Sequence, residues 1–115
     1  MYDYFKNKYP DLFADKNFCG FDCNEGWKDI LERLFVKIAD DMRRIGSTVD
    51  QVKEKFGGLR FYTSTCNDVI DEAINEAEKE AWKTCEYCGS KEDIKTEGGW
   101  LKTLCGKCRG DRFKK

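Results

Sequence analysis

Residues 27–63 decide the fold of this chain, and they read WKDILERLFVKIADDMRRIGSTVDQVKEKFGGLRFYT. In the first half, apolar side chains recur at the i, i+3, i+4, i+7 spacing of one helix face. They are Trp27, Ile30, Leu31, Leu34, Phe35, Ile38, Ala39 and Met42. Gly46 follows as a residue that suits the left-handed end of a helix. The pattern predicts an amphipathic helix over about 27–44, with Asn24 or Asp22 as its N-cap.

The second half predicts a β-hairpin over about 48–64. Its two runs flank Gly57-Gly58, and paired glycines suit a type I′ turn because both of its central positions need positive φ. In that register Phe56 faces Leu59, with Val52, Phe61 and Thr63 on the same side. The opposite face then carries Lys53, Lys55, Arg60 and Tyr62. This face can grip phosphates or an acidic partner, or it can be an ordinary solvated surface.

The remaining segments predict a second helix and a short N-terminal one. The second runs over about 67–83, capped by Asn67 or Thr65, with a narrow apolar stripe and a strongly acidic exposed face. The stripe consists of Val69, Ile70, Ala73, Ile74, Ala77 and Ala81, and the acidic face of Asp71, Glu72, Glu76, Glu78 and Glu80. The aromatic residues near the N-terminus either cap the core from a short helix or belong to a loosely attached arm.

Four cysteines after the second helix have the spacing of a metal site, Cys85-x2-Cys88-x16-Cys105-x2-Cys108. Two Cys-x-x-Cys knuckles around a hairpin that turns at Gly98-Gly99 are typical of a zinc ribbon. We therefore predict one structural Zn²⁺ held by four thiolates, with no open position for water. A redox dithiol is the rival interpretation. It is typical of a single such motif at a helix N-terminus that follows a strand.

The sequence thus predicts an α+β fold: two main helices and a β-hairpin packed together over residues 1–82, followed by a zinc ribbon over residues 83–115. The helix leads directly into Cys85, so we expect the module to be rigidly attached. The other three cysteines are Cys19, Cys23 and Cys66. We expect their thiols to be buried or half-buried. A second, three-thiolate metal site is the alternative.

Composition narrows the function. The chain of 115 residues contains no histidine, which removes the side chain most used for acid–base catalysis near neutral pH. Residues 83–115 hold nine Lys/Arg against five Asp/Glu, or +4, and the first 82 residues hold twelve against seventeen, or −5. No apolar run reaches the roughly 18–20 residues of a membrane span. Residues 1–6 lack the basic-then-apolar order of a secretory signal, so we expect no such signal. We expect a cytoplasmic protein that is not an enzyme.

Several stretches resemble a family of small, uncharacterised proteins encoded by phages and prophages. They are Tyr9-Pro10-x-Leu12-Phe13, residues 20–27 (GFDCNEGW), residues 51–62 (QVKEKFGGLRFY), Cys85-Glu86-x-Cys88-Gly89 and residues 98–105 (GGWLKTLC). The resemblance implies a phage-type origin and a C-terminal zinc-binding end, and it implies no established enzymatic activity. It carries no catalytic residue over to this chain. The family often has His or Cys at the last ligand position, which is Cys108 here.

Two binding functions follow as hypotheses. In the first, the protein binds a host or phage protein and inhibits host defence or transcription machinery, as anti-CRISPR proteins do. In the second, the zinc ribbon and its basic end bind nucleic acid. The residues expected to contact a partner are Lys53, Lys55, Arg60, Tyr62, Trp100, Arg109 and Arg112.

Overall fold

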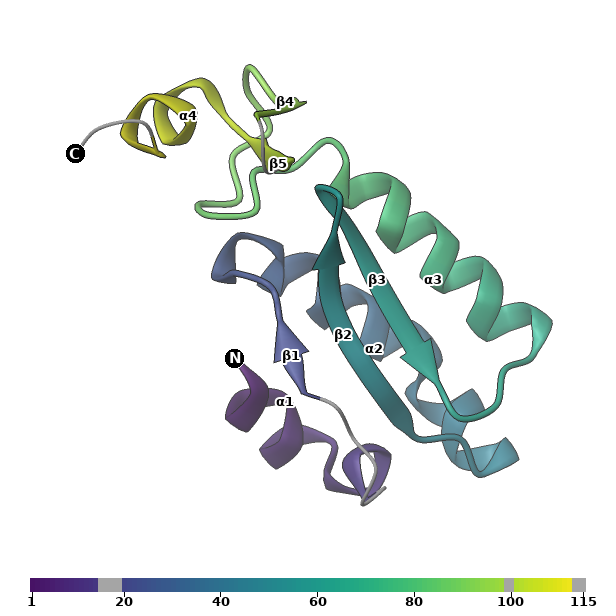
Figure 1. Cartoon of the computed structure of the whole chain (residues 1–115). Helices are drawn as coiled ribbons and strands as arrows, with labels where there is room; N and C mark the ends of the chain where they lie inside the picture. Colours follow the sequence, from purple (N-terminus) through teal and green to yellow (C-terminus); the bar gives the residue numbers. More distant parts are fainter. Residues whose placement is uncertain (15–19, 99–100, 113–115) are drawn as a thin grey trace.

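The amphipathic helix and the hairpin pack against each other in the computed structural model of the chain, which describes residues 1–14, 20–98 and 101–112 (Figure 1). The elements, in chain order, are α1 (Tyr2–Lys8), the 3-10 turn η1 (Pro10–Phe13), β1 (Phe21–Asp22), the 3-10 turn η2 (Glu25–Trp27), α2 (Lys28–Ile45), β2 (Val49–Lys55), β3 (Gly58–Thr63), α3 (Asp68–Ala81), β4 (Lys95–Glu97), β5 (Lys102–Leu104) and α4 (Gly106–Arg112). Strands β1, β2 and β3 form one sheet in that order, and β4 pairs with β5. The predicted α+β class is confirmed.

Helix α2 supplies the centre of the core, as its periodicity predicts. All of its predicted stripe is buried, together with Trp27 just before the helix. Gly46 ends the helix with φ of +71°, and its amide returns to the last carbonyls of α2. The helix lies behind the sheet in Figure 1. Its buried side chains belong to the same core cluster as Val52 and Phe61 of the hairpin.

Helix α3 runs alongside β3 and packs on α2 (Figure 1). Asn67 caps it, since the Oδ1 atom of Asn67 accepts the amide of Ile70 at 2.9 Å. Val69 was wrongly placed in the stripe: it is 53% exposed, because it lies one helical step outside the alanines that contact α2. Two carboxylates of the expected acidic face form ion pairs with lysine or arginine side chains. Glu76 pairs with Lys37, and Glu80 pairs with Arg33 and Lys91.

The aromatic residues at the N-terminus cap the core. Phe5 and Phe13 are buried, and both rings contact Phe35 of α2, with centroids 5.0 and 5.8 Å apart respectively. Pro10 opens η1, where its missing amide donor is harmless. Of the two interpretations of this segment, the docked helix is correct for the residues that the structure describes.

The hairpin turns one residue earlier than predicted. Lys55 pairs with Gly58, and Phe56 and Gly57 occupy the two turn positions with φ of +54° and +88°. Val52 is then opposite Phe61, and a bulge beside Asp50 lets Val49 face the core as well. The register has a tertiary cause: a Cβ on Gly58 would lie 2.6 Å from the ring of Trp82. Gly58 is therefore needed for close packing in β3, and the turn takes a phenylalanine.

This turn carries the first testable prediction. Phe56 is 66% exposed and holds a left-handed backbone conformation that a bulky side chain disfavours. Replacing Phe56 with Asn, which tolerates this conformation, is expected to raise the free energy of unfolding by about 0.5–1 kcal/mol. Urea denaturation measures the change. Tyr62→Asn, which removes an exposed aromatic ring from a strand position of the same hairpin, is the control and is not expected to stabilise; equal effects would contradict the account.

The C-terminal part forms a small module with its own apolar cluster around Cys85, Leu104 and Cys105. Strands β4 and β5 pair antiparallel, with Thr96 opposite Thr103, so the predicted hairpin is confirmed; Gly99 lies outside the described residues. Helix α4 was not predicted. Gly89 ends the first knuckle with φ of +81°, whereas Gly110, the glycine that follows the second knuckle, lies within α4.

Among the helices in the described part of the chain, none has the length and apolar character to cross a membrane. The molecule measures 46 × 25 × 22 Å along its principal axes. The C-terminal module lies at the end of the sheet where β2 turns into β3, so the hairpin tip and the module are neighbours (Figure 1).

Candidate metal centre

The four predicted ligands converge on one point. Cys85 and Cys88 lie in the loop that follows α3, Cys105 comes directly after β5, and Cys108 lies in the first turn of α4. Their Sγ atoms all lie within 4.8 Å of one another, and the Sγ atoms of Cys88 and Cys105 are 3.7 Å apart. A tetrahedral ion with metal–sulfur bonds of about 2.3 Å requires sulfur–sulfur edges of about 3.8 Å. The cysteines therefore form a site that can hold a metal ion.

Backbone hydrogen bonds give the two knuckles matching shapes. The amide of Gly89 donates to the carbonyl of Cys85 at 2.9 Å, and the amide of Arg109 donates to the carbonyl of Cys105 at 2.9 Å. The amide of Cys108 also points at the Cys105 sulfur, 3.5 Å away. Amides directed at the sulfurs stabilise their charged form.

The acidity of the thiols favours a bound cation. Burial opposes ionisation of Cys85, but backbone amides, including those of Cys105 and Cys88, lower the pKa of its thiol to about 7. Burial and the neighbouring thiols of Cys105 and Cys85 raise the pKa of Cys108. The sulfurs are too close to ionise together by themselves, so a divalent cation is what would hold all of them as thiolates.

The second knuckle has one feature of the redox alternative. Cys105 follows strand β5 and its Cys-x-x-Cys motif opens helix α4, the location in which a redox dithiol is found. In a redox dithiol, two sulfurs form a disulfide with each other and no further thiols complete a cluster around them. Here Cys85 and Cys88 complete a four-sulfur cluster, and that arrangement favours a metal.

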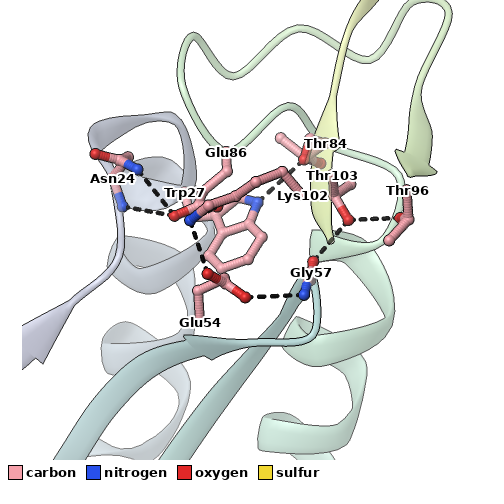
Figure 2. Close-up of polar contacts among 9 residues, drawn as sticks. All are labelled: Asn24, Trp27, Glu54, Gly57, Thr84, Glu86, Thr96, Lys102 and Thr103. Carbon is pink, nitrogen blue, oxygen red and sulfur yellow. Dashed lines mark hydrogen bonds and ion pairs between the residues drawn. The ribbon is translucent and has the colours of Figure 1, made fainter. Parts of the chain in front are cut away.

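A buried polar cluster joins this module to the rest of the protein (Figure 2). Glu86, inside the first knuckle, is fully buried, and its Oε2 accepts from the backbone amide and the side-chain amide of Asn24 at 3.1 and 3.0 Å. The Nζ of Lys102 lies 2.7 Å from an oxygen of Glu54 and 3.2 Å from Glu86. One ammonium group thus lies between a carboxylate of the hairpin and a carboxylate of the knuckle.

Other contacts extend this interface. The indole Nε1 of Trp27 donates to the carbonyl of Thr84 at 3.0 Å, and the hydroxyl of Thr103 donates to the carbonyl of Gly57 at 2.6 Å (Figure 2). The amide of Gly26 donates to the carbonyl of Glu86 at 2.8 Å. Element η2, strand β2 and the β2–β3 turn therefore all contact the module through polar contacts, and the expected rigid attachment has a structural basis. Asn24 bonds to Glu86 and makes no side-chain cap for a helix.

Lys102 yields a second prediction. Burial lowers its pKa, but Glu54 and Glu86 raise it more, so the ammonium group is retained in the folded protein. A lysine whose pKa is higher in the folded than in the unfolded protein contributes its full stabilisation of the fold at neutral pH. That stabilisation is lost only as the pH rises above about 10. Lys102→Met leaves two buried carboxylates without their cation and is expected to cost about 2 kcal/mol at pH 7.

Thermal and urea unfolding of Lys102→Met measure this loss. Lys91→Met is the matched control: Lys91 pairs with Glu80 on the surface, with 59% of its side chain exposed, so its loss is expected to be below about 1 kcal/mol. If both variants lose the same stability, the buried cluster does not fix the module.

The structure divides the predicted partner-contacting residues. Lys53, Arg60 and Tyr62 lie on one face of the hairpin, with Lys55 at its tip. Trp100 lies outside the described residues, and the side chain of Arg112 also lies outside them.

Arg109 was predicted to contact a partner, and the structure corrects this prediction because its side chain is bonded within the module. Its side chain is only 13% exposed, and its guanidinium donates to the carbonyls of Asp93 and Leu104 at 2.6 and 2.9 Å, and to the carboxylate of Asp93 at 2.9 Å. Because these bonds tie α4 to the hairpin of the module, Arg109 supports the cysteine centre and is not a free cation on a partner surface.

The remaining thiols have separate environments. Cys23 is half-buried, and burial together with the charge of Glu86 raises its pKa to about 12, so it is an inert thiol. Cys66 is exposed, which corrects the prediction of a buried thiol, because it lies in the loop before α3. Cys19 lies outside the described residues. The structure groups only Cys85, Cys88, Cys105 and Cys108 as possible metal ligands within its described part.

In comparisons with known proteins, no family model, no curated protein and no solved structure matches this chain.

Proposed function

We propose that this protein is a non-catalytic binding protein whose four-cysteine centre holds one structural zinc ion. The convergence of the four sulfurs within 4.8 Å is the observation that supports it. A set of four thiolates fills a tetrahedral ion completely, so no position remains for a water molecule or a substrate. The acid–base groups next to the centre support a structural role too, since Glu86 is fully buried and bonded to Asn24 and Lys102.

Zinc is preferred to iron within this proposal, although both accept four thiolates in a tetrahedron. Zinc has no redox chemistry, which suits an ion that only stabilises a fold. Replacement of the native ion by Co²⁺ tests the geometry: we expect the absorption spectrum of a tetrahedral tetrathiolate complex. A visible charge-transfer spectrum in the protein as purified, before cobalt is added, would instead identify iron.

The partner we propose is a protein of the host or of the phage, and inhibition of host defence or transcription machinery is the proposed consequence. This part depends on the phage-type resemblance of residues 51–62 and of the cysteine knuckles. Nucleic acid is the second candidate. It is weakened because Arg109, one of the cations assigned to it, is bonded within the module.

Affinity capture from a bacterial lysate, with and without nuclease treatment, tests the partner class. We expect a protein that is retained equally after nuclease treatment. Material that disappears with nuclease, together with direct binding of the purified protein to labelled DNA or RNA at about 50 mM salt, would overturn the protein-partner proposal in favour of nucleic acid.

A further inference from the structure

One face of the β2–β3 hairpin has no helix over it. Helix α2 covers the opposite face, and α3 lies along the outer edge of β3 (Figure 1). There a carboxylate oxygen of Glu78 accepts the amide of Phe61 at 3.3 Å. Side chains alternate between the two faces, so the pairs Lys53–Arg60 and Gln51–Tyr62 lie on the face without a helix. We call these four residues, with Lys55 and Trp82, the open face.

Trp82 belongs to the open face through Gly58. Gly58 has the same orientation as Arg60 and Tyr62 along β3, and a Cβ added there would lie 2.6 to 3.2 Å from three atoms of the Trp82 indole. The indole therefore lies over the end of the hairpin, while 43% of the residue stays exposed. Sequence periodicity gave no reason to place Trp82 there, because the residue lies outside the apolar stripe of the predicted helix.

The aromatic rings enclose the cations. Gly58, under Trp82, and Tyr62 are separated by four residues of strand, or about 13 Å. Arg60 lies between them, opposite Lys53, and the ammonium of Lys53 is 5.7 Å from the centre of the Tyr62 ring. Arginine, tyrosine and tryptophan are the residues that contribute most to protein–protein binding when they are grouped in this way.

The cations of the open face are not neutralised across the hairpin. Lys53 is opposite Arg60, and Lys55 is opposite a glycine, so each cross-strand pair lacks a carboxylate. Glu78, whose charge reaches Arg60, is bonded to the Phe61 amide. The Nε of Arg60 has no hydrogen-bond acceptor among the described residues. A carboxylate from a partner would supply one once the side chain turns outward.

The positive charge of the open face is moderate, and this helps to distinguish a nucleic acid from an acidic protein segment as its partner. Asp22 of β1 is in register with Lys53, so a carboxylate lies at the edge of the three cations. A groove that follows a nucleic-acid backbone needs cations over many phosphates. A small cationic centre between two aromatic rings suits a short protein segment with acidic side chains around an apolar anchor.

We propose that the open face binds an acidic, aromatic-containing segment of a partner protein, with Arg60 and Lys53 pairing to its carboxylates and Trp82 and Tyr62 packing on its apolar side chain. This rests on the proposed binding function and gives that partner its chemistry. The segment would lie across β2 and β3 between the two rings.

The test uses the metal-loaded chain of 115 residues, labelled with ¹⁵N. The probe is a synthetic peptide of about a dozen residues, rich in Glu and Asp with two Phe, at about 50 mM salt, where charge screening is weak. Chemical-shift changes are expected at Lys53, Arg60, Tyr62 and the indole of Trp82. The same peptide with Gln and Asn in place of its acids is expected to bind roughly tenfold more weakly or not at all.

Charge-reversal variants locate the site. Lys53→Glu with Arg60→Glu is expected to weaken peptide binding by roughly tenfold or more. Lys6→Glu is the matched control, because Lys6 is an exposed lysine of α1, whose Phe5 packs on the core side. Circular dichroism and metal content verify that both variants fold, and Trp82→Ala gives an independent reading of the aromatic contact.

The proposal is overturned if the acidic peptide causes no shifts at the open face, if the control variant loses as much affinity as the double variant, or if an oligo-dT of equal length binds the open face more tightly than the peptide. The proposed function fails differently, through an absence of nuclease-resistant partners. A partner that binds the double variant as well as the wild type would retain the proposed function and exclude the open face.

Discussion

Removal of the metal by a strong chelator is expected to unfold residues 83–112 while α2 and the β2–β3 hairpin stay folded. The module has little apolar core of its own, since its buried cluster consists mainly of Cys85, Leu104 and Cys105. In comparable small modules, metal binding supplies on the order of 10 kcal/mol of the folding free energy. The body keeps its separate core around Trp27 and Phe35.

Two-dimensional NMR of the labelled protein measures this outcome. Signals of β4, β5 and α4 are expected to collapse to unfolded positions with chelator and to return when zinc is added. Some loss of stability is also expected in the body, because Asn24 and Glu54 lose their contacts with Glu86 and Lys102.

A cysteine variant gives the same result without a chelator. Cys105→Ser is expected to reproduce the unfolded module, since hydroxyl is a poor zinc ligand compared with thiolate. Cys66→Ser is the matched control, an exposed cysteine outside the cluster, and is expected to leave the module folded. An apo protein whose module spectrum is unchanged would show that the metal does not stabilise the module.

Gly26→Ala is the second change with a large expected effect. A Cβ at this position would lie 2.2 Å from the carbonyl oxygen of Cys85 and 2.4 Å from that of Glu86. Both atoms belong to the backbone of the first knuckle, so they cannot move aside as a flexible side chain would. The variant is expected to lose about 3 kcal/mol of unfolding free energy and the Gly26–Glu86 hydrogen bond.

Urea denaturation and the NMR signals of Asn24 and Glu86 measure the Gly26→Ala effect. Gly110→Ala is the control, because Gly110 lies in α4, has nothing within 4 Å of an added Cβ, and is expected to be neutral or slightly stabilising. A Gly26→Ala protein as stable as the Gly110→Ala protein would mean that the knuckle and η2 are not in close contact.

Patterns local in sequence predicted most of the fold. The stripe of α2, the Asn67 cap of α3 and each of the two Cys-x-x-Cys knuckles depend on residues a few positions apart, and each is found in the structure. The register of the hairpin depends on Trp82, which is distant in sequence from Gly58, and the glycine pair alone therefore predicted the wrong turn.

The buried cluster between body and module was not predictable in the same way. Glu54, Glu86 and Lys102 come from three separate segments, and each one alone has the appearance of a surface residue. Two sequence features were available: Glu86 lies between two ligands of a tight knuckle, and Gly26 lies two residues after Asn24, where a close backbone approach needs glycine.

The metal content of the protein, purified under reducing conditions without added metal or chelator, tests the central claim most directly. Elemental analysis is expected to find one zinc ion per chain in the wild type and in Cys66→Ser, and none in Cys105→Ser. A wild-type protein that is folded throughout residues 83–112 and contains no metal, or a Cys105→Ser protein with undiminished zinc, would contradict the account.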